Sequence, residues 1–134
     1  MSKKISIEVI DIVYKLLISG GINLEIFKGN KPASFSGECI VINALPLSND
    51  QLQECIINVN VFVPNLTLKI GTNQDNSQAN YERIKVLSLK VSEILNEVDI
   101  DDWSLNIDQE YVLENEGFNE HFNNFRISFR NENI

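Results

Sequence analysis

Two cysteines and one histidine are the side chains of this sequence best suited to chemistry. Cys39 and Cys55 form no C-x-x-C motif and have no histidine close by in the chain. A zinc site needs three or four histidine, cysteine or carboxylate ligands at workable spacing, and the sequence offers no such set. We therefore predict no metal and no cofactor. We interpret both cysteines as reduced core residues, with a disulfide between neighbouring strands as the alternative.

His121 is the only candidate general base, with Asp108, Glu110 and Glu120 as its possible acidic companions. The sequence has no G-x-S-x-G turn to present a serine nucleophile, and its glycines form no phosphate-binding loop. A lone histidine next to Phe122 is more typical of a packing residue near a strand end. The residues therefore favour a protein that is not an enzyme.

Length and charge narrow the function classes further. The chain has 134 residues, which predicts a single domain over 1–134. Its 11 basic and 19 acidic residues give a net charge of −8, which argues against binding to nucleic-acid phosphates or to an anionic membrane surface. No apolar run is long enough to span a membrane. Charged residues interrupt the N-terminal segment, so we expect no secretory leader.

Hydrophobic periodicity predicts two helices and five strands. The helices cover residues 3–19 and 77–98, the second with a cap near Asn76 or Ser77. The strands cover residues 22–27, 38–43, 53–63, 103–113 and 121–130. The order α-β-β-β-α-β-β predicts an α+β fold in which two helices pack on an antiparallel or mixed sheet of about five strands.

The first predicted helix carries more apolar surface than one sheet can cover. Besides its main stripe, it has four further apolar side chains, and together they make about two thirds of its circumference apolar. Either loops of the same chain or a neighbouring subunit must cover this excess. The additional residues, which we take as a candidate subunit interface, are Ile7, Ile10, Tyr14 and Ile18.

The connection over residues 64–78 is longer than most loops, which indicates a functional or mobile segment. Within it Leu66, Leu68 and Ile70 alternate with polar residues. This pattern predicts an arm or hairpin that packs one face on something; the alternative is an extension of the third strand. We add these three residues to the candidate interface.

Polar residues on strand faces form a second candidate set. Asn58 and Asn60 lie in the middle of a strand, where asparagine is disfavoured, so they need hydrogen-bond partners or a wet face. A hairpin of the last two strands would bring Asp108 and Glu110 near Arg126 and Arg130. These charges either pair across the strands or only solvate an outer face.

Four segments together resemble a known family. They are the leading helix with Val13-Tyr14, the strand end IVINALP (40–46), the strand INVNVFVPNL (57–66) and the closing NNFRISFR (123–130). The chain resembles the small tail-terminator and tail-completion proteins of long-tailed bacteriophages. The likeness covers nearly the whole chain and is one of pattern, without a catalytic or ligand motif.

This resemblance implies a homo-oligomeric ring, commonly a hexamer, at the junction of head and tail. Such a ring would cap the tail tube, stop its polymerisation and join the tail to the filled head. Its partners would be other copies of the chain, a tail tube protein and a head-connector protein, with DNA passing through without being held. It would be a virion component assembled in the cytoplasm of the bacterial host.

A second reading is a small acidic binding protein of the immunity or antitoxin type. Its acidic residues would complement a basic partner and speed association electrostatically. It would be a monomer or dimer that forms one tight heteromeric complex, whereas the first reading requires a ring.

Overall fold

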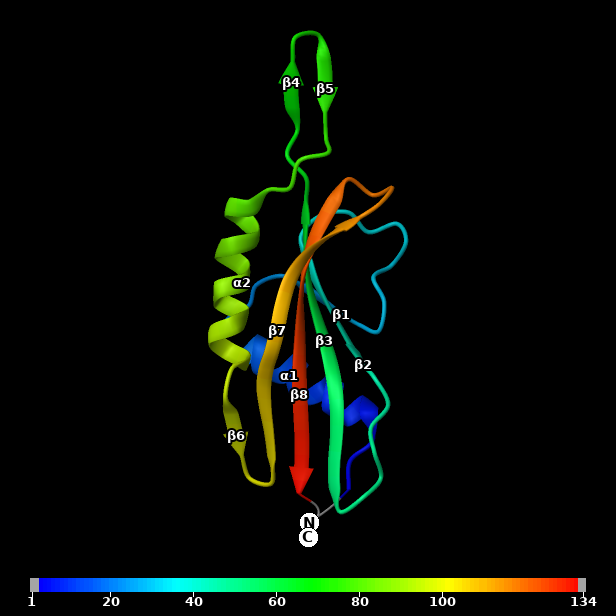
Figure 1. Cartoon of the computed structure of the whole chain (residues 1–134), viewed down its shortest axis with the longest axis vertical. Coiled ribbons are helices and arrows are strands. Elements are labelled where there is room, and N and C mark those ends of the chain that lie inside the picture. Colours follow the sequence, from blue (N-terminus) through cyan, green and yellow to red (C-terminus); the bar gives the residue numbers. More distant parts are fainter. Residues whose placement is uncertain (1–2, 133–134) are drawn as a thin grey trace.

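A six-stranded sheet forms the body of the protein, seen in a computed structural model that describes residues 3–132 (Figure 1). The strand order is β1-β2-β3-β8-β7-β6. β1 runs parallel to β2, and every other neighbouring pair is antiparallel. The strands are β1 (Glu25–Lys28), β2 (Cys39–Ala44), β3 (Leu52–Pro64), β6 (Val98–Ile100), β7 (Trp103–Asn115) and β8 (Glu120–Glu132).

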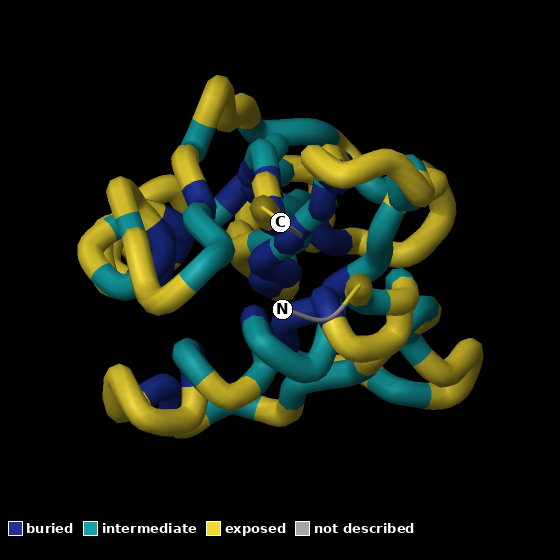
Figure 2. The backbone as a smooth tube through the Cα atoms, turned by 90° about the horizontal axis from the view of Figure 1, so that it is seen from below, coloured by how far each residue is buried: buried dark blue, intermediate teal, exposed yellow. Residues whose placement is uncertain are grey.

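Both helices, α1 (Ser6–Ser19) and α2 (Tyr81–Leu95), cover the same face of this sheet and enclose the main core. α1 buries Val9, Val13 and Leu17 completely, which are spaced about one helical turn apart. They pack against apolar side chains of β2, β3 and β8. These are the alternate residues of each strand, which point to the helix-covered face of the sheet. Seen along the long axis, the buried backbone lies centrally and the exposed backbone around it (Figure 2).

The two helices approach each other closely where α1 ends. A Cβ atom on Gly20 would lie 2.5 Å from the Cδ1 atom of Ile94 on α2. The φ angle of Gly20 is −78°, which any residue can adopt, so this glycine is required by space and not by its backbone angle.

The opposite face of the sheet is divided. Near one end, a small apolar cluster is built on Cys39, Val41 and Phe62, and Phe35 from the segment between β1 and β2 packs on it. Phe62 stacks on Phe122 with a ring-centroid distance of 4.8 Å. The rest of this face carries mainly polar side chains, with Ile56 and Tyr111 among them.

A hairpin projects from the body along its long axis (Figure 1). It consists of β4 (Leu68–Ile70) and β5 (Asn73–Asp75), which pair with each other and belong to no larger sheet. We call the segment 65–76 the arm. Of the two alternatives for residues 64–78, the structure has the hairpin.

The α+β class with two helices packed on a mixed sheet is confirmed, whereas the predicted strand count and order are wrong. The main sheet has six strands because residues 98–100 form β6, and the hairpin adds two more. α2 is shorter than expected at both ends. It begins after Asn80, whose Oδ1 accepts a hydrogen bond from the backbone N–H of Arg83 at 3.2 Å. It ends before Glu97, whose φ of 53° breaks the helix.

Neither of the two described helices is long and apolar enough to cross a membrane.

Candidate interaction surfaces

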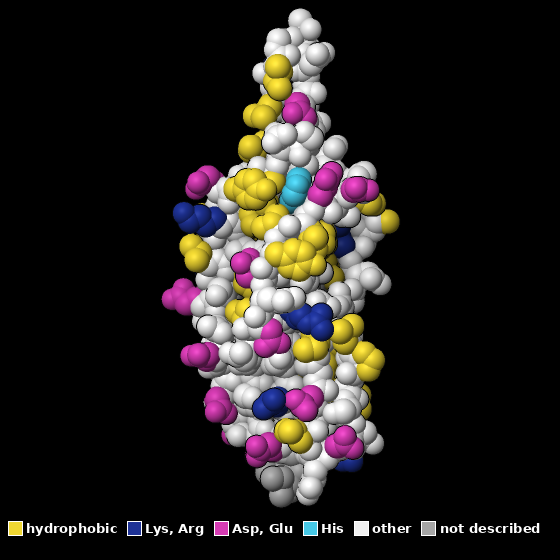
Figure 3. Space-filling model, viewed as in Figure 1, with side chains coloured by type: hydrophobic (Ala, Val, Ile, Leu, Met, Phe, Trp, Pro, Cys, Tyr) yellow, Lys and Arg dark blue, Asp and Glu magenta, His cyan; other side chains and the backbone are white. Residues whose placement is uncertain are grey.

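The arm exposes the three alternating apolar residues that the sequence singled out. Leu66 is 37% exposed, Leu68 38% and Ile70 63%. In β4 Leu68 and Ile70 share one face, since side chains alternate along a strand, and Lys69 points to the other. Figure 3 shows hydrophobic side chains along one side of the arm and over the upper part of the body, with charged side chains spread over the whole length of the body.

The base of the arm is held firmly by Asn65. Its Nδ2 donates to the backbone oxygen of Asn76 at 2.8 Å, and its backbone N–H donates to Asn119 at 2.8 Å. Its Oδ1 lies 2.6 Å from Nδ1 of His121. On the returning strand, hydrogen bonds from Ser77 to the carboxylate of Asp75 lower the pKa of that carboxyl group. The arm is therefore anchored at its base, with its apolar side chains facing solvent.

The additional apolar residues of α1 are covered only in part. Ile10 and Tyr14 are half-buried and pack against the main core. Lys28 of β1 lies 4.6 Å from the ring centroid of Tyr14 and pairs with Asp11 at 2.6 Å, so β1 shields this side of the helix. Ile7 and Ile18 remain 63% and 47% exposed.

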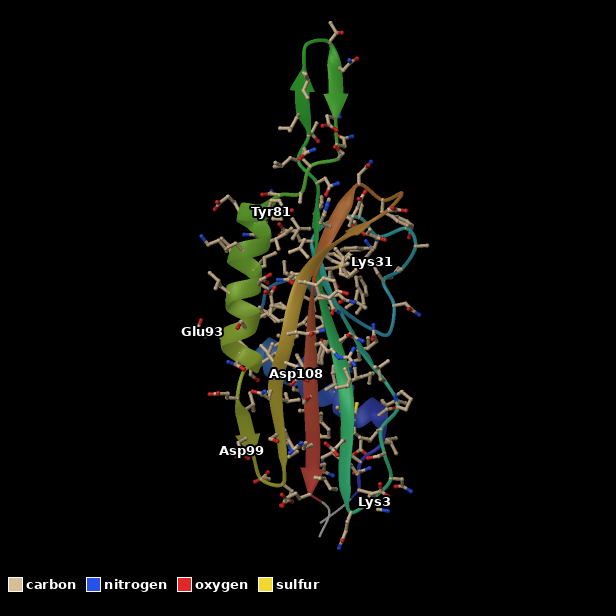
Figure 4. All side chains as sticks on the ribbon, viewed as in Figure 1. Lys3, Lys31, Tyr81, Glu93, Asp99 and Asp108 are labelled. Atoms are coloured by element: carbon tan, nitrogen blue, oxygen red, sulfur yellow. The ribbon has the colours of Figure 1, made fainter. Side chains whose placement is uncertain are left out.

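An apolar groove of about 450 Å³ lies between α2 and β7, and sequence reasoning missed it. The two exposed large hydrophobic side chains on its α2 side are Tyr81 and Leu89, 66% and 62% exposed. Tyr81 stands at the first turn of α2 (Figure 4). The groove is lined by Tyr81, Ile84, Lys85, Ser88, Leu89, Ser92, Glu110, Val112, Asn123 and Phe125. The sequence feature that could have revealed this groove is Leu89, an apolar residue that lies outside the main apolar stripe of α2.

Asn123 lies in the wall of this groove and is only 4% exposed. Its Nδ2 donates to the hydroxyl oxygen of Ser88 at 2.9 Å. Its Oδ1 is buried and has no hydrogen-bond partner among the described residues. A buried acceptor without a donor costs free energy, and because this atom has no exposed surface, no donor from outside the chain reaches it.

The mid-strand asparagines belong to a hydrogen-bonded row across the polar face of the sheet. Asn124 donates from Nδ2 to Oδ1 of Asn60 at 2.6 Å and to Oδ1 of Asn58 at 3.3 Å. Asn58 in turn donates to Oδ1 of Asn43 at 3.2 Å. These side chains have the partners that the sequence required, and they use no charged group.

The expected pairing of charges between β7 and β8 is wrong in its details. A register shift between Ile107 and Gln109 leaves Asp108 in a bulge, where it accepts a hydrogen bond from Ser128. Arg126 lies opposite Gln109 and Asn58 in the register of the sheet.

Arg130 pairs instead with Glu54 of β3 at 3.3 Å, although it shares a shallow hollow with Asp108. Because the bulge adds one residue, it moves Glu110 to the helix-covered face, where it borders the groove.

The candidate acid–base residues are not brought together. His121 contacts Asn65, whereas the adjacent Glu120 points to the other face of β8 and is held by Lys31 and by Nδ2 of Asn115 at 2.6 Å. Lys31 lies on the side of the sheet away from α2 (Figure 4). Across residues 3–132, no three His, Cys, Asp or Glu side chains are grouped so that they could hold a metal ion.

Both cysteines are free and buried, as the first of the two interpretations predicted. They lie on opposite faces of the sheet, since Cys39 belongs to the small apolar cluster and Cys55 to the main core. Burial raises the pKa of the Cys39 thiol to about 11, with the nearby Lys31 partly opposing it. Burial also raises the pKa of Cys55. Neither thiol is disposed to act as a nucleophile at neutral pH.

Comparison with known proteins identifies a shared fold. A chain from the virion of a native gene transfer agent particle superposes with a TM-score of 0.59 at 12% sequence identity. The match covers 90% of this chain and 91% of that one, so it extends over nearly the whole fold. No protein-family model matches the sequence, and no curated protein matches it.

Proposed function

We propose that this protein is a structural component of a phage or prophage virion and acts as a tail terminator. Copies of the chain form a homo-oligomeric ring that caps the tail tube and joins it to the head, and the resemblance to tail terminators implies a hexamer. Its partners are the tail tube protein and a head-connector protein. It assembles in the cytoplasm of the bacterial host and becomes part of the virion.

The observation that carries this proposal is the arm, on a fold shared with a chain of a virion particle. A fold alone does not specify a function. An anchored hairpin that exposes Leu66, Leu68 and Ile70 beyond the body is suited to contact another molecule. The resemblance of four sequence segments to tail-terminator proteins points to the same class.

The charge of the chain suits a channel for DNA. At a net charge of −8, a ring of several copies would repel the phosphates of DNA that passes through it. We therefore propose no specific binding of nucleic acid. We also propose a role without catalysis, since His121, Asp108 and Glu120 are engaged in separate contacts and Glu110 borders the groove.

The mass of the purified protein tests the ring directly. At high micromolar concentration, light scattering should give a multiple of 15.2 kDa, about 91 kDa for six copies, and negative-stain images should show rings. A strict monomer under these conditions would contradict the proposal. A monomer that forms one tight complex with a basic protein would favour the immunity or antitoxin type instead.

Deletion of the gene from an inducible prophage tests the role in assembly. Without a terminator, electron microscopy of the lysate should show tails of abnormal length and filled heads without tails. Expression of the gene from a plasmid should restore joined particles. Normal particles in the deletion strain would refute the assignment.

A further inference from the structure

Most of β7 forms an open edge of the main sheet. β6 pairs only with Trp103, Ser104 and Leu105 of β7. From Asn106 to Asn115, β7 pairs with β8 on one side and with no strand among residues 3–132 on the other. An open edge presents unpaired backbone N–H and C=O groups, which are a template for a strand from another chain.

The open edge borders the α2–β7 groove. Glu110 and Val112 of β7 line the groove, so a strand added at this edge would place every second side chain into it. Leu89 and Val112 offer apolar contacts there. An extended segment with alternating apolar residues would therefore fit this site.

The arm has these properties. Leu66, Leu68 and Ile70 recur at every second position, and β4 is already a strand with its outer edge unpaired within the described chain. The arm carries one cation, Lys69, and one anion, Asp75, so it has no net charge, whereas the whole chain carries −8. A neutral arm adds nothing to the repulsion between two acidic copies.

The arm cannot reach the groove of its own chain. Its base is fixed by the three contacts of Asn65, and it projects away from the body along the long axis (Figure 1). A contact between different surfaces of two copies is heterologous, and such contacts generate rings when the rotation between copies closes.

We propose that the arm of one copy lies in the α2–β7 groove of the next copy, where β4 extends the sheet along the open edge of β7. Leu68 and Ile70 enter the groove beside Leu89. This inference rests on the proposed self-assembly and names the surfaces that mediate it.

Cysteine pairs between two different copies test this contact. One copy carries Ile70→Cys in the arm, and a second, differently tagged copy carries Leu89→Cys in the groove. Both positions are about three-fifths exposed, so the variants should fold normally. Mild oxidation of the mixture should give a disulfide-linked heterodimer. The matched control is Val86→Cys, which is 55% exposed on the same helix but does not line the groove, and it should link at least tenfold less.

A second variant measures the contribution of the arm to assembly. Ile70→Ser should weaken self-association by about tenfold or more, because the contact between copies would lose an apolar side chain that it buries. Ile100→Ser on β6, exposed by 42%, should leave it unchanged.

The possible results separate this inference from the proposed function. Rings that form without the 70–89 cross-link and tolerate Ile70→Ser would overturn the arm–groove contact but leave the ring intact. A protein that stays monomeric and gives no cross-link would overturn both. An arm required only for binding a tail tube protein would also overturn this contact.

Discussion

Replacement of Gln53 by methionine tests how α1 is attached to the sheet. Gln53 lies on the core face of β3 and is 1% exposed. Its Oε1 accepts hydrogen bonds from the backbone of Lys4 at 2.8 Å and from Nδ2 of Asn131 at 3.0 Å. Its Nε2 donates to the backbone oxygens of Lys4 and Ser48, both at 3.0 Å. One amide group thus joins the segment before α1, the loop before β3 and the end of β8.

Methionine keeps the length of this side chain but removes all four hydrogen bonds. Asn131 is 1% exposed and loses a bond that water cannot easily replace, whereas Lys4 and Ser48 are half-buried and partly accessible to water. Each buried polar group that loses a partner costs about 1–3 kcal/mol, and accessible groups cost less. We expect Gln53→Met to lower the free energy of unfolding by about 2–4 kcal/mol. The melting temperature should fall by about 7–14 °C for a chain of this size.

Thermal and urea unfolding followed by circular dichroism measure this effect. Gln51→Met is the matched control, because Gln51 is exposed two residues earlier in the chain. Its melting temperature should stay within about 1 °C of the parent protein. A drop of less than about 2 °C for Gln53→Met, or an equal drop for the control, would refute the reasoning.

Three further substitutions test other parts of the fold. Lys31→Met should lower the free energy of unfolding by about 3 kcal/mol, because the carboxylate of Glu120 (side chain 5% exposed) loses its cation; adding Glu120→Gln should recover most of the loss in a urea titration. The raised pKa of Cys39, about 11 against an ordinary 9.0, means that the native state holds its thiol proton longer than the unfolded chain. Stability should therefore fall between pH 9 and pH 11, and it should fall less in Cys39→Ala; parallel pH profiles would contradict this. Gly20→Ala should cost about 1–3 kcal/mol because its Cβ meets Ile94, and shortening Ile94 to alanine in the same chain should remove most of that cost, as measured by urea unfolding.

Periodic elements were the part of the fold that the sequence predicted well. The helix expected over 3–19 is α1 (Ser6–Ser19), and the strands expected over 53–63 and 103–113 are β3 and β7. Long segments repeat their apolar spacing several times, so their type is secure even where their ends shift. β6 has three residues and was missed, because so short a segment shows no period.

The charge pairs failed for a different reason. Alternation along β7 placed Asp108 and Glu110 on one face, but a single-residue bulge at Asp108 sends Glu110 to the other. Since side chains in a strand have a period of two, one extra residue exchanges the faces of everything that follows. No residue type near Asp108 indicates that a bulge forms there.

The sequence by itself determined the secondary-structure class, the acidic character and the unusual apolar residues of α1 and of the segment 64–78. Each of these properties depends on the chain near a given residue. Only the tertiary structure decided that the arm projects from the body, that most of β7 is an open edge and that an apolar groove lies beside this edge. An edge or a groove exists only once distant strands have taken their order in the sheet, and local spacing does not encode that order.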